Sequence, residues 1–143
     1  MSVVAWDGKT LAADTQSTSS GMRMRCHKMA VSNGVVLAWI GDYEVGLMLA
    51  KWWAAGADPE KWPAVQSNPD RWSRLIVATK DDCSTYEQLP VALIVHDKFM
   101  AWGSGRDFAM GAMEMGASAE RAVEVACRWD TSCGLPAECC ALV

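Results

Sequence analysis

Four short apolar runs lie in the first forty positions, and turn dipeptides join them in two pairs. The runs cover residues 2–6, 9–13, 27–31 and 35–40. Asp7-Gly8 separates the first pair and Asn33-Gly34 the second. Because Asp-Gly and Asn-Gly are the dipeptides most typical of tight hairpins, the pattern predicts two antiparallel hairpins and a sheet system built on them.

The segments next to these hairpins have other patterns. Residues 15–21 are small and polar, which predicts a loop. After Gly41 the apolar spacing becomes helical, and Asp42 is suited to cap the helix. The apolar helix positions are Val45, Leu47, Met48, Leu49, Trp52 and Trp53. Gly56 is expected to end the helix, and the prolines within residues 57–72 predict an irregular connection with one or two short turns.

The second half of the chain again changes from strands to helices. Strands are predicted over residues 74–79, 85–89, 91–95 and 99–102. Helices are predicted over residues 107–115 and from Ser118 to about Trp129, followed by a strand over residues 137–143. Gly103-Ser104-Gly105 joins the last strand of the first group to the first of these helices. This order indicates an α+β fold, with two antiparallel sheets packed together and helices outside.

The bulk composition is that of a single globular domain spanning residues 1–143. Hydrophobic residues make up 51% of the chain and charged residues 21%, and 143 residues are too few for two ordinary domains. No apolar run is long enough to cross a bilayer, and the first residues do not read as a secretory signal. We therefore expect a cytoplasmic protein without a membrane partner. The net charge of -4 gives no electrostatic reason to expect nucleic acid.

Cysteine and tryptophan are both frequent. The six cysteines contain no C-x-x-C pair, which argues against a zinc site. Without a secretory signal we expect them to be reduced, and most of them to be small buried hydrophobes. The eight tryptophans have two interpretations, a Trp-rich core or a core together with contacts between subunits.

Ser2 is the first candidate for chemistry. Initiator Met is ordinarily removed when the second residue is small, and removal would leave a free α-amine on the residue that carries the hydroxyl. Such an amine has an ordinary pKa of about 8, so it can act as general base for its own hydroxyl. Many chains begin Met-Ser, and the feature alone has little weight.

Asp14 and Lys28 add weight to Ser2. Asp14 ends the second predicted strand and Lys28 lies on the third, so both can lie beside the start of the first strand. A lysine there would favour the deprotonated hydroxyl, and an aspartate beside the lysine would keep it charged and oriented. The alternative is an ordinary structural ion pair.

Three further candidates lie in turns. Gly41, between strand and helix, offers a backbone N–H to an oxyanion. Ser104 presents a small hydroxyl in a glycine turn, and Asp130, followed by a polar group that includes Cys133, can support the N-terminal residue by hydrogen bonds. Each is also an ordinary choice for a turn or a helix end.

Taken in order, these residues resemble the proteasome β-subunit and HslV peptidase family. The resemblance covers nearly the whole chain. It is carried by SVVAWDGKTLAADTQ, Lys28, Ile40-Gly41-Asp42, AWGSGRDFAMGAM and a last helix that runs into DTSCG. The part from AWGSG through the last helix is the most specific. The resemblance implies a four-layer αββα sandwich of the N-terminal-nucleophile hydrolase type, with the catalytic site at the mouth between the sheets.

The resemblance also implies residue roles. Ser2 matches the family's N-terminal Thr nucleophile, Asp14 and Lys28 its Asp and Lys, Gly41 its oxyanion glycine, and Ser104 and Asp130 its supporting Ser and Asp. It implies peptide-bond hydrolysis through an acyl-enzyme with no metal or organic cofactor. It further implies rings of identical subunits that degrade peptides or unfolded proteins, served by an AAA+ ATPase unfoldase.

Some positions depart from the family pattern. The family has Thr where this chain has Ser2, which lacks the methyl group that restricts the rotamer. Cys133 falls where a Ser is usual, and the chain is shorter than typical members, as expected for a small bacterial or bacteriophage protein. One alternative is therefore a catalytically silent oligomeric structural or binding protein that retains Met1. Another is an amidase that acts on a small substrate.

Overall fold

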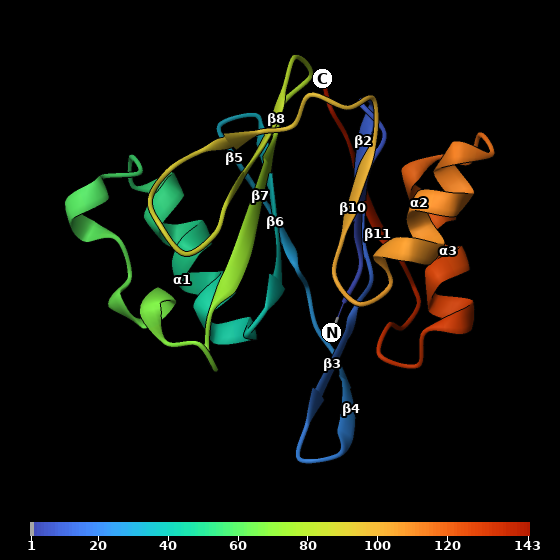
Figure 1. Ribbon diagram of the computed structural model, residues 1–143, viewed down its shortest axis with the longest axis horizontal. Coiled ribbons are helices and arrows are strands. Elements are labelled where there is room, and N and C mark those ends of the chain that lie inside the picture. Colours follow the sequence, from blue (N-terminus) through green and yellow to red (C-terminus); the bar gives the residue numbers. More distant parts are fainter. Residues whose placement is uncertain (1) are drawn as a thin grey trace.

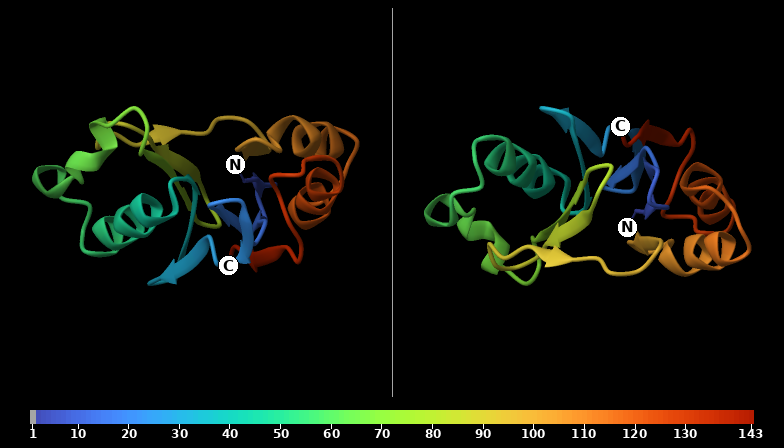
Figure 2. Two further views of the ribbon diagram at one scale, coloured as in Figure 1. Left: turned by 90° about the horizontal axis from the view of Figure 1, so that it is seen from below. Right: turned by 90° about the horizontal axis from the view of Figure 1, so that it is seen from above.

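The computed structural model describes residues 2–143, and its elements form four layers (Figure 1). Two antiparallel sheets pack face to face. Helix α1 (Tyr43–Ala54) covers one sheet, and helices α2 (Arg106–Glu114) and α3 (Ala119–Trp129) cover the other. The same layers are seen from above and from below (Figure 2). This order confirms the predicted α+β class and the αββα sandwich implied by the resemblance.

The sheet next to α2 and α3 has four strands in the order β10-β1-β2-β11. Their bounds are β1 (Val4–Trp6), β2 (Thr10–Ala13), β10 (Met100–Trp102) and β11 (Glu138–Ala141). The first predicted hairpin is present, and the Asp7 carboxylate closes its turn by accepting hydrogen bonds from the N–H groups of Lys9 and Thr10. Because β1 is a central strand, the residues just before it are enclosed by neighbours on both sides.

The sheet next to α1 has five strands in the order β5-β6-β7-β8-β9. Their bounds are β5 (Met29–Ser32), β6 (Val35–Gly41), β7 (Ser73–Ala78), β8 (Cys83–Tyr86) and β9 (Leu93–Ile94). Asn33 and Gly34 both have positive φ angles, 50° and 79°, as the predicted tight turn requires. The connection from α1 to β7 contains only the short turns η1 (Pro59–Lys61) and η2 (Ala64–Ser67), as expected from its prolines.

The loop predicted over residues 15–21 is wrong. The segment forms strand β3 (Gln16–Ser19), which pairs with β4 (Met22–Arg25) as a separate hairpin that projects from the sandwich (Figure 1). Ser20 and Gly21 make its turn with φ angles of 51° and 76°. The hairpin has little buried apolar surface, so pairing of the two backbones stabilises it. Its side chains therefore do not alternate between apolar and polar, which is the pattern that would predict a strand.

Alternation along the strands divides the core into layers. Val4, Leu11, Ile76 and Trp102 pack between the two sheets. Val3, Ala12 and Val123 belong to the layer under α2 and α3, and Leu37, Trp39 and Leu49 to the layer under α1. Consecutive residues such as Val3 and Val4 therefore serve different layers, because successive side chains of a strand point to opposite faces.

The cysteine prediction is only partly right. Within residues 2–143 all six cysteines are free, but only Cys83 and Cys133 are fully buried, and Cys139 is exposed. Tryptophan is also divided, since Trp129 is 62% exposed while Trp39 and Trp102 are buried in the core. None of the helices within the described residues is both long and apolar enough to cross a membrane.

Gly46 allows α1 to pack closely on the sheet. A Cβ at this position would overlap the indole ring of Trp39, which is buried beneath the helix. We expect Gly46→Ala to lower the free energy of unfolding by about 1–3 kcal/mol, the usual cost of overpacking. Denaturation with urea measures the change.

Gly111→Ala in α2 is the matched control. A Cβ there has no neighbour within 4 Å, so the substitution should stabilise the protein by about 0.5–1 kcal/mol through helix propensity. Equal effects of the two substitutions would contradict the packing role of Gly46.

Candidate active site

Ser2, Lys28 and Asp14 form a buried chain of hydrogen bonds at the mouth between the sheets. Lys28 Nζ donates to Ser2 Oγ at 3.1 Å and to Asp14 Oδ1 at 2.8 Å. All three residues are at most 4% exposed. A buried ammonium between a hydroxyl and a carboxylate is well placed to stabilise negative charge on the hydroxyl oxygen.

Backbone groups hold the Asp14 carboxylate in place. Its Oδ1 accepts the N–H of Val3 at 3.1 Å, and its Oδ2 accepts the N–H groups of Gln16 at 3.2 Å and Gly134 at 3.1 Å. These three donors come from the residue just before β1, from the start of β3 and from the loop after α3, and Lys28 adds a fourth from just before β5. The carboxylate is therefore fully partnered although no part of it contacts solvent.

Lys28 is positioned by the sheet on the opposite side of the sandwich. It comes immediately before β5, and its carbonyl accepts the N–H of Trp39 at 3.1 Å, which extends the β5–β6 pairing by one residue. Its neighbour His27 accepts a hydrogen bond at its carbonyl from the Tyr43 hydroxyl at 3.0 Å. The His27 ring also pairs with Glu138 of β11. Lys28 thus reaches from one sheet to a carboxylate on the other.

The glycine turn after β10 encloses the backbone of Ser2. The Ser2 carbonyl accepts the N–H of Gly105 at 3.2 Å and the Ser104 hydroxyl at 3.4 Å. A Cβ at Gly103 would overlap this carbonyl, and Gly103 has a φ of 102°, so the turn can approach Ser2 only with glycine there.

Asp130 and Cys133 lie next to this turn. The Cys133 thiol donates to Asp130 Oδ2 at 3.4 Å and lies 4.0 Å from the Ser104 hydroxyl. Burial raises the pKa of the Cys133 thiol, so it stays protonated and acts as a donor. Burial alone would raise the pKa of Asp130 as well. Hydrogen bonding to the neighbouring Ser104 hydroxyl, the Ser132 N–H and the thiol outweighs it and holds that pKa below its ordinary value.

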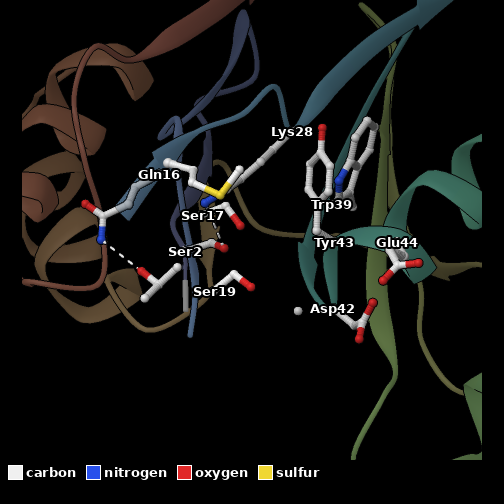
Figure 3. A pocket seen from close by; sticks show the side chains of 12 residues that line it. Ser2, Gln16, Ser17, Ser19, Lys28, Trp39, Asp42, Tyr43 and Glu44 are labelled. Atoms are coloured by element: carbon white, nitrogen blue, oxygen red, sulfur yellow. Dashed lines mark hydrogen bonds between the residues drawn. The ribbon is translucent and has the colours of Figure 1, made fainter. Parts of the chain in front are cut away.

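A cavity of about 420 Å³ opens beside Ser2. Figure 3 shows Ser2, Lys28 and the β3 residues Ser17 and Ser19 on one side, with Trp39, Tyr43, Asp42 and Glu44 on the other. The cavity therefore runs between the projecting hairpin and the start of α1.

Gly41 also lines this cavity at the end of β6. Its φ is 99°, and a Cβ would lie 2.7 Å from the carbonyl oxygen of Trp72, so only glycine fits. Asp42 caps α1, as predicted, by accepting the N–H of Val45 at 3.1 Å. Its pKa is lowered, chiefly by the hydrogen bond from Arg71, which outweighs burial.

The structure brings the six predicted site residues to one end of the sandwich. Ser2, Lys28 and Gly41 line the cavity, Asp14 lies behind Lys28, and Ser104 and Asp130 lie on the side of the Ser2 carbonyl. The predicted removal of Met1 falls outside the described residues.

Sequence reasoning missed several residues of the site. Gln16 lines the cavity, and its side-chain amide donates to the carbonyl of Thr131 at 3.2 Å, which ties the hairpin to the loop after α3. Tyr43 and Trp39 form the opposite wall. Gln16 belongs to a segment predicted as a loop, and Trp39 reads as an ordinary core residue. Only the position of Tyr43 directly after Gly41-Asp42 offered a signal.

Comparison with known proteins shows which type of fold the chain has. No protein-family model matches the chain, and no curated protein sequence does so significantly. Among solved structures, it is similar to the Thiobacillus denitrificans protein BPH, solved alone and in complex with epoxomicin. The TM-score is 0.76 and the identity 20%, over 99% of this chain and 98% of the BPH chain in the complex.

It is also similar to the eukaryotic HslV of Trypanosoma brucei, with a TM-score of 0.72 and 17% identity over 99% of this chain and 98% of that chain. The chain therefore has the HslV type of fold, which is a proteasome-like N-terminal-nucleophile hydrolase fold. At the level of fold, this confirms the resemblance noted from the sequence.

Asp14→Asn tests how far stability depends on the buried pair. The substitution leaves the Lys28 ammonium without a counter-charge and places an amide against two N–H donors. We expect the free energy of unfolding to fall by about 3–5 kcal/mol, measured by urea denaturation. The exposed Asp81→Asn is the control and should change it by no more than about 0.5 kcal/mol. A fall of similar size in both variants would contradict the assignment.

The lowered pKa of Asp130 predicts a pH dependence. A carboxyl whose pKa is lower in the folded than in the unfolded protein stabilises the fold at pH values above its unfolded pKa of about 4. That stabilisation is lost as the pH falls through the pKa of the folded protein. Unfolding free energies between about pH 5 and 2.5 should therefore fall more steeply for the wild type than for Asp130→Asn. Parallel curves for the two proteins would refute this.

Proposed function

We propose that the chain is an N-terminal-nucleophile peptidase that cleaves peptide bonds through Ser2 after Met1 is removed. The observation that carries the proposal is the pair of hydrogen bonds from Lys28 Nζ, to Ser2 Oγ at 3.1 Å and to Asp14 Oδ1 at 2.8 Å. An ion pair with only a structural role needs no nucleophilic oxygen beside it. Here the Ser2 hydroxyl lies beside the pair, and both Ser2 and Lys28 border an open cavity. The HslV type of fold supports the same assignment.

The reaction would proceed in two steps. In the first, Ser2 Oγ bonds to the substrate carbonyl carbon and passes its proton to the α-amine of the same residue. When the carbon–nitrogen bond of the substrate breaks, that proton goes to the leaving amine and an acyl-enzyme remains. In the second step water attacks the ester carbonyl, the α-amine takes its proton, and Ser2 Oγ is released protonated.

The surrounding residues would lower the barriers of both steps. The Lys28 ammonium stabilises negative charge on Ser2 Oγ, and Asp14 holds the ammonium in position. The backbone N–H of Gly41 is the proposed donor to the oxyanion, since Gly41 lines the cavity beside Ser2. Ser104 and Asp130 are proposed to hold the N-terminal residue in place through its carbonyl and its amine. These steps need no metal or organic cofactor.

The cavity is suited to an extended polypeptide. Within residues 2–143, strand β3 pairs only with β4 and its other edge is free, and Gln16, Ser17, Thr18 and Ser19 all line the cavity. An extended peptide can add to such an edge by main-chain hydrogen bonds, which are independent of its sequence. We therefore propose peptides or unfolded proteins as substrates, rather than a small amide.

We propose the oligomeric assembly from the similarity of the fold to that of HslV. A ring of identical subunits, with an AAA+ ATPase that unfolds substrates, would restrict access to the cavity to unfolded chains. A chain that retained Met1 would lack the α-amine on Ser2, and the protein would then be the silent oligomer considered above.

Ser2→Ala is expected to abolish cleavage of a fluorogenic peptide, at least about 10³-fold in kcat, because the nucleophilic oxygen is lost. Ser84→Ala, on β8 and outside the cavity, is the matched control and should keep full activity. Intact mass of the purified wild type should correspond to a chain without Met1. A mass that includes Met1, or turnover that survives in Ser2→Ala, would refute the peptidase assignment.

A further inference from the structure

A second cavity, of about 200 Å³, lies at the base of the projecting hairpin. Its walls include Arg23 and Arg25 of β4, together with Thr15, Gln16 and Gly134, and none of its lining residues is acidic. Gln16 and Met24 line both this cavity and the one beside Ser2, so the two adjoin.

The two arginines of this cavity are unusual within the molecule. Arg71, Arg74, Arg106 and Arg121 each pair with a carboxylate, and Arg128 lies over the ring of Trp129. Within residues 2–143, neither Arg23 nor Arg25 forms a salt bridge. Residues 15–27 contain two arginines and no acidic side chain, although the chain as a whole has a net charge of -4. The hairpin base is therefore a local cationic site on an acidic protein.

The strand geometry lets both arginines reach one ligand. Residues two apart on a strand point to the same face, about 7 Å apart along the chain, and an arginine side chain easily spans half of that distance. Each guanidinium presents paired N–H donors that match the oxygens of a carboxylate or a phosphate. The cavity is large enough for such a group, and its lining carries no charge that would repel it.

We propose that this cavity is an anion-binding site, in which Arg23 and Arg25 together hold one oxyanion group. The group is either the carboxylate of an acidic polypeptide segment or a phosphate. The proposal does not depend on peptidase activity.

The position of the site links it to Asp14. The Thr15 N–H donates to the carbonyl of Gly134 at 3.0 Å, and the Gly134 N–H donates to Asp14 Oδ2 at 3.1 Å. Both residues line the anion cavity. An occupant would therefore lie against the backbone that holds Asp14, and the amide resonances of Thr15 and Gly134 should report its binding.

An NMR titration of the ¹⁵N-labelled protein tests the proposal, following the Arg Nε–H groups and these two amides. One arm adds inorganic phosphate and the other an acetylated, amidated tri-aspartate peptide. Saturable shifts at Arg23, Arg25, Thr15 and Gly134 are expected in at least one arm, and the arm with the lower dissociation constant identifies the preferred oxyanion.

Variants distinguish binding at these two arginines from a nonspecific effect of the net charge. Arg23→Gln combined with Arg25→Gln should weaken binding at least tenfold. Arg128→Gln also removes one positive charge from an exposed arginine, but it should leave binding unchanged. Arg23→Lys with Arg25→Lys should fall between them, because the charge remains without the paired donors. Arg23 and Arg25 both lie on the exposed strand β4, and unchanged shifts in the sheets would show that each variant is folded. No saturable shift in either arm, or equal weakening by Arg128→Gln, would overturn the proposal.

Discussion

The buried pair of Asp14 and Lys28 is the interaction on which the rest of the site depends. Asp14 follows β2 in one sheet and Lys28 precedes β5 in the other, so their 2.8 Å contact joins the two halves of the sandwich at its open end. Two buried charges are stable only when each is fully partnered. Asp14 has three backbone donors besides Lys28, and Lys28 has the Ser2 hydroxyl as a further partner. A requirement of folding thereby places an ammonium beside a hydroxyl.

Close backbone approach is the second constraint. The turn at Gly103 lies against the carbonyl of Ser2, and Gly41 lies against the backbone at Trp72, each with a positive φ. Side chains at these positions would push the turn away from Ser2 or the end of β6 away from β7. The site is thus surrounded by main-chain groups whose positions are set by the sheets, which is the kind of preorganisation that the proposed acyl transfer needs.

In the two proposals made above, the cavities on the two sides of the hairpin base give β3 and β4 a larger part in function than their size suggests. One side presents a free strand edge to the cavity beside Ser2, and the other presents two arginines. The hairpin contributes little to the core because its residues are largely exposed. Its sequence is therefore free to serve binding.

Much of the fold of this protein could be predicted from the sequence alone. The Asp-Gly and Asn-Gly turns, the helix cap at Asp42 and the alternating apolar residues are local signals, and they predicted the hairpins, α1 and the layered fold. The resemblance to the proteasome and HslV family implied that Ser2, Asp14, Lys28, Gly41, Ser104 and Asp130 form one candidate site. The tertiary structure decided what depends on contacts between distant segments. The projecting hairpin forms by backbone pairing that leaves no side-chain pattern. The walls at Gln16 and Tyr43, and the partners of Asp14, exist only because separate elements meet at the end of the sandwich. Local patterns predict the secondary structure of a segment, whereas the packing of the whole chain determines which groups lie beside a buried polar side chain.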